Sequence, residues 1–162
     1  MVFSPLAAWV FLPFLATIAI WVAWSDMARM KIPNRAVLAL WLVWLFPGIL
    51  LVPLKLWALG WALAAILLVA GFIANAAGLM GAGDAKFASA MAPFFVGADL
   101  RLVLGLAAAC LLGAFAAHRL ARAIAPIRRV APDWESWTHD DFPMGLALSG
   151  MLLIALIAAI VP

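Results

Sequence analysis

Two aspartates, Asp26 and Asp84, carry the strongest chemical signal in a chain of 162 residues with only seven acidic side chains. Asp26 closes a long apolar run, and Asp84 follows a glycine-rich stretch just before another apolar segment. Two carboxylates held close together cannot both ionise cheaply, so they share a proton and one pKa rises. The ionised carboxylate can then act as general base on a water, while the protonated one donates to a substrate carbonyl. Such a pair could carry out peptide hydrolysis without a covalent intermediate.

The residues around Asp84 predict a site that a backbone can approach. Gly81 and Gly83 leave no Cβ atoms beside the carboxylate, so an extended substrate strand could come close. Lys86 either balances charge near the pair or marks the membrane interface. We therefore predict that Gly81, Gly83 and Lys86 bind substrate or shape the site. Each feature alone has a plainer interpretation, since aspartates also cap helices and glycine clusters also mark turns.

The elements that position these residues must be membrane helices. Hydrophobic residues make up 70% of the chain and charged residues 10%, and the mean hydropathy is +1.21. A soluble domain is about half apolar and about a quarter charged. A chain of this size cannot hide the excess in its core, so lipid must be the solvent for most of it. The composition predicts an all-α fold, a polytopic transmembrane helix bundle that forms a single domain over residues 1–162.

Apolar segments divide the chain into about six crossings. Five of them approach the roughly 20 residues that span the hydrocarbon. A sixth, shorter segment at about 86–98 contains Pro93 and is tilted, re-entrant or completed by its flanks. A polar loop is predicted at 121–143. The five longer segments lie at about 5–25, 36–53, 56–76, 101–120 and 144–161.

Basic residues orient these crossings. If the N-terminus is periplasmic and the segment at 86–98 crosses, the outer connections carry only Lys55 and Arg101. Cytoplasmic connections of membrane proteins are enriched in Lys and Arg, so this orientation is preferred. It places Asp26 and Asp84 on the cytoplasmic face. The eight basic residues on that side are Arg29, Lys31, Arg35, Lys86, Arg119, Arg122, Arg128 and Arg129.

No metal, cofactor or nucleic acid is expected. A single cysteine, Cys110, allows neither an internal disulfide nor a zinc site built from several cysteines. His118 and His139 are expected at the interface or in solvent rather than as ligands. The basic residues sit beside apolar runs instead of gathering on one face, so they indicate topology and a lipid bilayer as partner, not nucleic acid.

Three motifs in order resemble the type IV prepilin peptidase family, bacterial membrane aspartic proteases with a Gly-x-Gly-Asp motif. Asp26, followed by Ile32-Pro33-Asn34, resembles the first aspartate motif of that family. Gly78-x-x-Gly81-x-Gly83-Asp84-x-Lys86 resembles the second. Phe142-Pro143-Met144-Gly145 resembles a Pro-aromatic-Gly element, although Met144 replaces the expected aromatic residue, a departure that bears on packing.

The resemblance implies that Asp26 and Asp84 are the catalytic aspartates of a prepilin leader peptidase in the bacterial inner membrane. It implies a prepilin substrate whose basic leader is removed at the cytoplasmic face, after a glycine and before a hydrophobic helix. Acidic loop residues such as Asp140 or Asp141 are candidate contacts for that leader. Larger family members add a cytoplasmic region with paired cysteines and methylate the new N-terminus. Because Cys110 is alone, the chain resembles the short, peptidase-only form of Flp/Tad-type pili, and no methyltransferase activity is expected.

Two other functions fit part of the pattern. A small ion-coupled transporter also uses intramembrane carboxylates, but it would place them near the bilayer midplane in interrupted helices, whereas these lie at helix ends. A non-catalytic pilus or secretion assembly subunit would rely on small-residue helix contacts such as Gly105, Ala109 and Gly113. That alternative gives no reason for two aspartates on one face.

Overall fold

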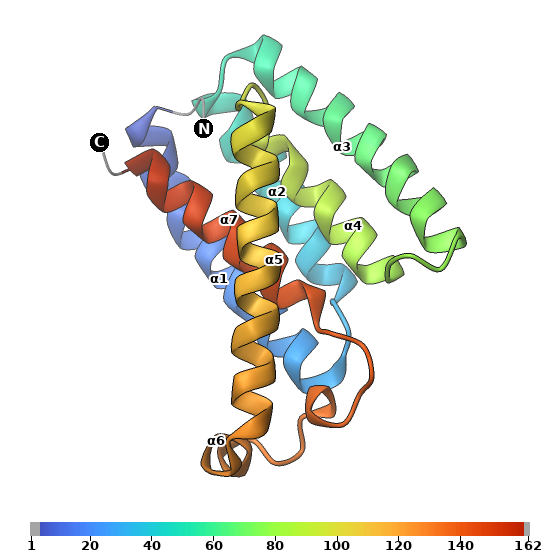
Figure 1. The fold of residues 1–162 in the computed structure, drawn as a ribbon. Helices are drawn as coiled ribbons and strands as arrows, with labels where there is room; N and C mark the ends of the chain where they lie inside the picture. Colours follow the sequence, from blue (N-terminus) through green and yellow to red (C-terminus); the bar gives the residue numbers. More distant parts are fainter. Residues whose placement is uncertain (1–3, 161–162) are drawn as a thin grey trace.

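The computed structural model describes residues 4–160, which form a bundle of helices joined by short connections (Figure 1). No strand occurs among the described residues, so the predicted all-α fold is confirmed. Two short 3-10 helices are η1 (Ala92–Phe95) and η2 (Glu135–Trp137). The α-helices are α1 (Pro5–Arg29), α2 (Asn34–Leu51), α3 (Leu54–Ala76), α4 (Ala82–Met91), α5 (Leu100–Ala123), α6 (Ala125–Val130) and α7 (Met144–Ile160).

The centre of the bundle consists of α1, α2, α4 and α7, which pack on one another. Phe94 of η1 lies edge-to-face against Phe11 of α1, with ring centroids 5.4 Å apart, and against Trp44 of α2 at 5.3 Å. All three rings are fully buried. Such pairs add about 0.5–1.5 kcal/mol each beyond the burial of their area. This aromatic centre fixes how α1 and α4, which carry the two aspartates, lie relative to each other.

Helices α3 and α5 lie at the periphery and expose most of their surface. In α3 only Gly60, Ala64 and Gly71 are buried, and in α5 only Cys110 and His118. A helix that is apolar on nearly all sides and leaves most of its surface exposed belongs in lipid. The exposed apolar surface of these two helices therefore agrees with the membrane class predicted from composition.

Four helices in the described part of the chain are long and apolar enough to cross a membrane: α1, α2, α3 and α5. The apolar helix α7 has 17 residues. The predicted segment at 86–98 is instead α4 followed by η1, and it begins earlier, at Ala82. The 10 residues of α4 and the 4 residues of η1 together give a length of about 23 Å, less than the roughly 30 Å thickness of the hydrocarbon layer. This segment can be short because it lies inside the bundle, where Phe87 and Phe94 are fully buried.

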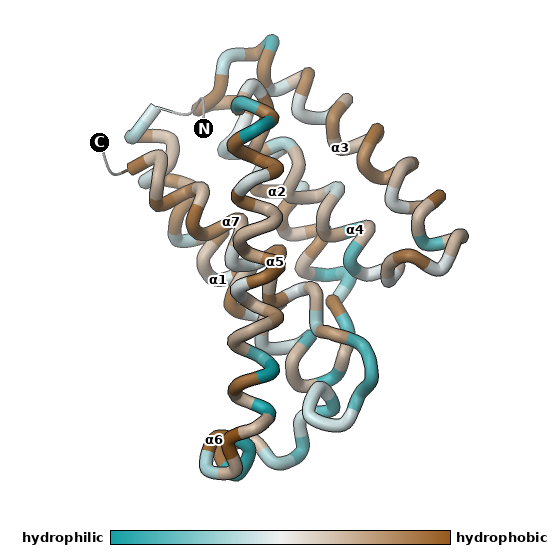
Figure 2. Tube along the Cα trace, viewed as in Figure 1, coloured by the Kyte–Doolittle hydropathy of each residue, from teal (hydrophilic) through white to brown (hydrophobic). Residues whose placement is uncertain are grey.

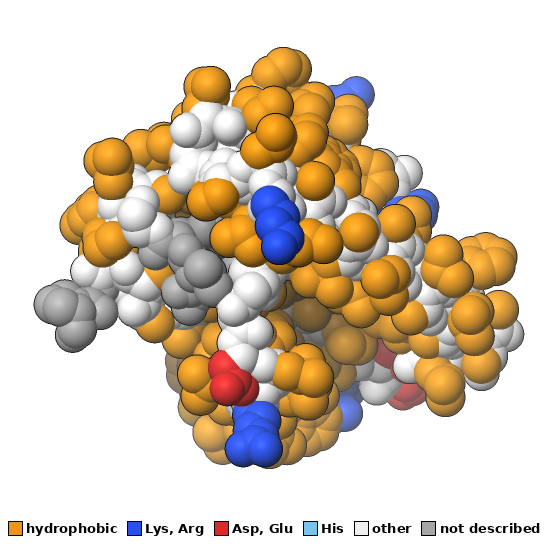
Figure 3. All heavy atoms as spheres, turned by 90° about the horizontal axis from the view of Figure 1, so that it is seen from above, with side chains coloured by type: hydrophobic (Ala, Val, Ile, Leu, Met, Phe, Trp, Pro, Cys, Tyr) orange, Lys and Arg blue, Asp and Glu red, His pale blue; other side chains and the backbone are white. Residues whose placement is uncertain are grey.

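The helices alternate in direction, so several ends that are distant in the sequence meet at one end of the bundle. In Figure 1 the end of α1, the start of α2, the start of α4, the end of α5 and the start of α7 all lie toward the lower end. The start of α1 and the end of α7 lie at the opposite end. Hydrophilic positions gather at the lower end in Figure 2. The view from above in Figure 3 is dominated by hydrophobic side chains, with isolated charged ones. Both aspartates therefore lie at the polar end of the bundle.

The segment between α5 and α7 is fastened by aromatic contacts. Trp137 is buried and stacks on His118 of α5, with ring centroids 5.6 Å apart and planes inclined by 8°. The Trp137 indole N–H donates to the carbonyl of Ala131 at 2.8 Å. The expectation that His118 faces the interface or solvent was wrong, because this stack leaves its residue only 2% exposed. The polar loop is thus held against the end of α5.

Candidate active site

Asp26 is presented by the last turn of α1. The helix ends because Met30 adopts the left-handed conformation, with φ of 50°, and its N–H still donates to the Asp26 carbonyl at 2.9 Å. The Ser25 hydroxyl donates to the carbonyl of Lys31 at 2.8 Å and holds the chain that follows. The Asp26 residue is only 5% exposed. A carboxylate this buried needs a hydrogen-bond partner.

That partner is the backbone of Gly145 in the first turn of α7. Its N–H donates to Asp26 Oδ2 at 2.7 Å. A Cβ at position 145 would lie 2.9 Å from Oδ2, 3.0 Å from Cβ and 3.1 Å from Cγ of Asp26. The N–H at a helix start has no partner within its own helix, so it is free to bind an anion. Only glycine at this position lets α7 approach Asp26 so closely.

Asp84 lies in the first turn of α4, three residues after the N-cap Gly81. The helix N-terminus favours a negative charge there. Burial, followed by the charge of Asp26, nevertheless raises the pKa of Asp84 from 3.8 to about 6, and a backbone hydrogen bond at Gly81 opposes the rise. The effect of Asp26 on this pKa means that the two carboxylates interact across the site.

The turn before α4 determines where Asp84 lies. Gly78 has φ of +72°, a left-handed conformation that glycine adopts without steric cost. The Asn75 side-chain amide donates to the carbonyl of Met80 at 2.9 Å and closes the turn. These contacts start α4 with its N-terminus, and therefore Asp84, at the polar end of the bundle.

The structure gives Gly81 and Gly83 a packing role beside the one expected from sequence. A Cβ on Gly81 would lie 2.6 Å from Asp84 Oδ2, and one on Gly83 would lie 3.3 Å from the Ile32 Cβ. Lys86 Nζ donates to Asn34 Oδ1 at 3.3 Å. The segments around Asp26 and Asp84 are therefore in direct contact, as their resemblance to two motifs of one site suggested.

Both aspartates line the same two cavities. The larger has a volume of about 850 Å³ and the smaller about 270 Å³. The smaller one also carries Lys31, Asn34 and Lys86. A shared cavity gives water and a substrate access to both carboxylates, which general acid–base hydrolysis requires. The other lining residues of the larger cavity are Met30, Gly78, Leu79, Met80, Gly81, Leu111, Phe115, His139, Asp141, Phe142 and Met144.

Sequence reasoning missed some residues of this site. Gly145 was not singled out as a site residue, although its place in a motif that opens the last helix was the available signal. His139 was expected at the interface or in solvent; its side chain is 45% exposed, and it also lines the larger cavity. Of the two candidate leader contacts, only Asp141 lines that cavity and Asp140 does not. No group of three potential metal ligands occurs among residues 4–160.

Four apolar helices long enough to cross a membrane, together with two carboxylates that line shared cavities, suggest a multi-pass membrane protein with a site at one end of its helix bundle. Comparison with known families agrees. A model of the type IV leader peptidase family matches residues 13–118 of this chain. The chain belongs to that family, and its general function is that of a type IV leader peptidase. Comparison with curated proteins finds no match, and comparison with solved structures finds none either.

Proposed function

We propose that this chain is an aspartic endopeptidase that removes the basic leader from Flp-like type IV prepilins at the cytoplasmic face of the bacterial inner membrane. The observation that carries the proposal is the convergence on shared cavities of Asp26 and Asp84, two residues 58 positions apart in the sequence (84 − 26). The family membership supports a leader peptidase in general. The catalytic residues, the substrate and the membrane side are the finer part of the proposal.

The two carboxylates divide the chemistry between them. The ionised carboxylate takes a proton from water, and the water oxygen adds to the scissile carbonyl carbon. The protonated carboxylate donates its proton to the carbonyl oxygen. The resulting tetrahedral intermediate expels the amine, which takes up a proton from the pair as the C–N bond breaks. The products are the leader with a new carboxylate and the pilin with a new amino terminus. The raised pKa of Asp84 supports this cycle, because it keeps one proton available to the pair near neutral pH.

The membrane side is proposed from charge. The eight basic residues assigned to the cytoplasm from sequence belong to helix ends and connections at the same end of the bundle as both aspartates. Lys55 and Arg101 lie at the starts of α3 and α5, at the opposite end. Because Lys and Arg are retained on the cytoplasmic side, this end faces the cytoplasm, where a prepilin leader is located.

The test is the mass of a candidate Flp-like prepilin after incubation with the protein in lipid vesicles. The proposal predicts two fragments, the leader ending in glycine and the pilin beginning at its hydrophobic helix. The matched control is the protein with both Asp26→Asn and Asp84→Asn, which should insert equally well and release nothing. Intact prepilin with the wild-type protein, or equal cleavage by the double variant, would contradict the proposal.

A further inference from the structure

The larger cavity at the aspartate pair is strongly anionic. Its lining contains three carboxylates, those of Asp26, Asp84 and Asp141, and includes neither Lys nor Arg. The smaller cavity on the same pair is bordered by Lys31 and Lys86 instead. A chain that passes over the pair therefore meets opposite charges on its two sides. The larger cavity is complementary to a cationic segment of a bound peptide.

Of the three carboxylates, that of Asp141 is the one best exposed to a ligand. Its side chain is 84% exposed, and within the described residues its one close polar side-chain neighbour is His139, with Nδ1 3.7 Å from Oδ2. The same Nδ1 accepts the Asp141 backbone N–H at 3.1 Å. The His139 side chain is itself 45% exposed, so solvent reaches both groups and the Asp141 carboxylate stays accessible to a ligand.

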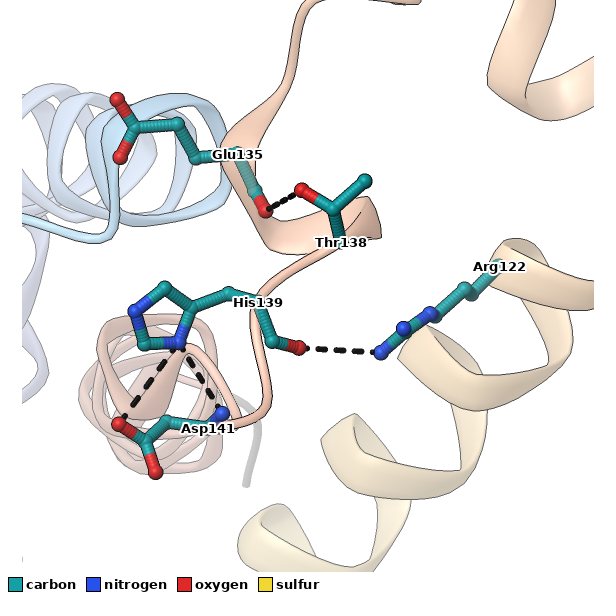
Figure 4. Close-up of polar contacts among 5 residues, drawn as sticks. All are labelled: Arg122, Glu135, Thr138, His139 and Asp141. Carbon is teal, nitrogen blue, oxygen red and sulfur yellow. Dashed lines mark hydrogen bonds and ion pairs between the residues drawn. The ribbon is translucent and has the colours of Figure 1, made fainter.

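An arginine at the end of α5 contacts the backbone of this loop. Arg122 donates to the backbone carbonyl of His139 at 3.2 Å, and Figure 4 shows it on the other side of the loop from the Asp141 carboxylate. This bond fixes the loop backbone without neutralising Asp141. The carboxylate therefore remains available to a cation that arrives with a substrate.

The loop that carries Asp141 is held in place before any ligand binds. Phe142 packs edge-to-face against Phe115 of α5 at 5.6 Å and against His118 at 5.8 Å. The Ser136 hydroxyl contacts Met27 Sδ of α1 at 3.9 Å. A group fixed in this way loses little conformational entropy on binding, which favours specific recognition. Asp141 therefore lies at the cavity on a loop that is held in place by packing contacts on both sides.

We propose that Asp141 is a specificity-determining residue that binds a Lys or Arg side chain of the leader while the scissile peptide lies at Asp26 and Asp84. The inference rests on the proposed function, because it concerns the same cavity and the same reaction. The Asp141 carboxylate pairs with the substrate cation at the cavity mouth. It takes no part in bond breaking, so it acts on binding of the leader and not on the chemical step.

The test measures KM and kcat on prepilin peptides that differ only in leader charge: basic, neutral or acidic. Asp141→Asn raises KM for the basic leader about two- to fivefold, the range expected of an exposed ion pair, and leaves kcat unchanged. Its effect on the neutral leader is absent, and added salt reduces the difference between wild type and variant. Asp141→Lys reverses the preference, so that the acidic leader binds better than the basic one.

The matched control is Asp140→Asn, which removes the same charge from the neighbouring residue outside the cavity and leaves KM within error of wild type. An unchanged KM in Asp141→Asn, or a rise that is equal for basic and neutral leaders, would overturn the inference while wild-type cleavage upholds the proposed function. A failure of the wild-type protein to cleave any of the three peptides would overturn both.

Discussion

The two aspartates reach the same cavity but are held in place by different means. Asp26 is buried and receives its hydrogen bond from Gly145, 119 residues away in sequence. Asp84 is half-buried and is stabilised from Gly81, three residues before it, at the start of its own helix. One carboxylate therefore depends on how α1 packs against α7, and the other on how α4 begins. A substitution at Gly145 should therefore affect mainly Asp26, and one at Gly81 mainly Asp84.

Of the changes at the two glycines, Gly145→Ala should have the larger effect. The new Cβ meets the Cβ and Cγ of Asp26 at about 3 Å, so α7 must move and the 2.7 Å hydrogen bond is lost. Misplacing a catalytic group by about 1 Å costs on the order of 10²-fold in rate. We expect a loss of that size in the initial rate of prepilin cleavage.

The control on the same helix is Gly150→Ala. A Cβ there meets nothing within 4 Å, so the rate should stay within about twofold of wild type. Alanine also favours the helix by about 1 kcal/mol over glycine, so this variant should not unfold. Equal losses of activity in the two variants would show that Asp26 does not depend specifically on Gly145.

A smaller loss is expected for Gly81→Ala. The new Cβ would lie 2.6 Å from Asp84 Oδ2, but that atom is the far end of a flexible side chain that can rotate away. We expect about a tenfold fall in the same cleavage rate, well short of the loss in Gly145→Ala. If Gly81→Ala were the more damaging of the two, the local account of Asp84 would be wrong.

The coupling between the two carboxylates can be measured as a change in the pKa of Asp84. Replacing Asp26 with Asn removes the charge that is the second cause of the rise. The pKa of Asp84 should then fall below about 6 but stay above 3.8, because burial, the larger cause, remains. A titration of the 13C-labelled Asp84 carboxyl group in both proteins gives the two values. An unchanged pKa would mean that the carboxylates do not interact.

The smallest effect concerns stability. Because folding raises the pKa of Asp84 above 3.8, its ionised form costs stability at pH values above about 6, and its protonated form below 3.8 costs none. Asp84→Asn should therefore be more stable than wild type at pH 8, by about 1 kcal/mol after allowing for solvent screening. That corresponds to roughly 2–4 °C in Tm.

Thermal unfolding at several pH values in the same lipid or detergent measures this difference. The Tm advantage of Asp84→Asn should shrink as the pH falls through about 6 and vanish below 3.8. Gly150→Ala, which changes no ionisable group, serves as the control and should show no such profile. A Tm difference for Asp84→Asn that grows toward acid pH would contradict the sign of the argument.

Much of the fold could be predicted from the sequence, because lipid imposes a simple rule on helix length. The five long apolar segments agree with α1, α2, α3, α5 and α7 to within a few residues at each end. The segment at 86–98 was displaced, since its helix begins at Ala82 and its burial comes from neighbouring helices. A pattern within one segment does not reveal such tertiary contacts.

The candidate site, like the fold, could be predicted from the sequence only in part. Asp84 and its glycines lie in one short motif, so their proximity is a local property that the sequence shows. The contact between Gly145 and Asp26 arises only when the first and last helices of the bundle pack together. The burial of His118 under Trp137 is likewise a long-range contact, and the sequence indicated only a polar neighbourhood.

The central claim is that Asp26 and Asp84 act as one catalytic unit. The most direct measurement is the initial rate of prepilin cleavage by wild type, by Asp26→Asn, by Asp84→Asn and by the double variant, all inserted in the same vesicles. Residues that act as a unit are not additive, so each single variant should lose as much as the double, on the order of 10⁴-fold or more. A single variant that keeps a substantial part of the wild-type rate would show that its aspartate is not part of the pair and would contradict the account.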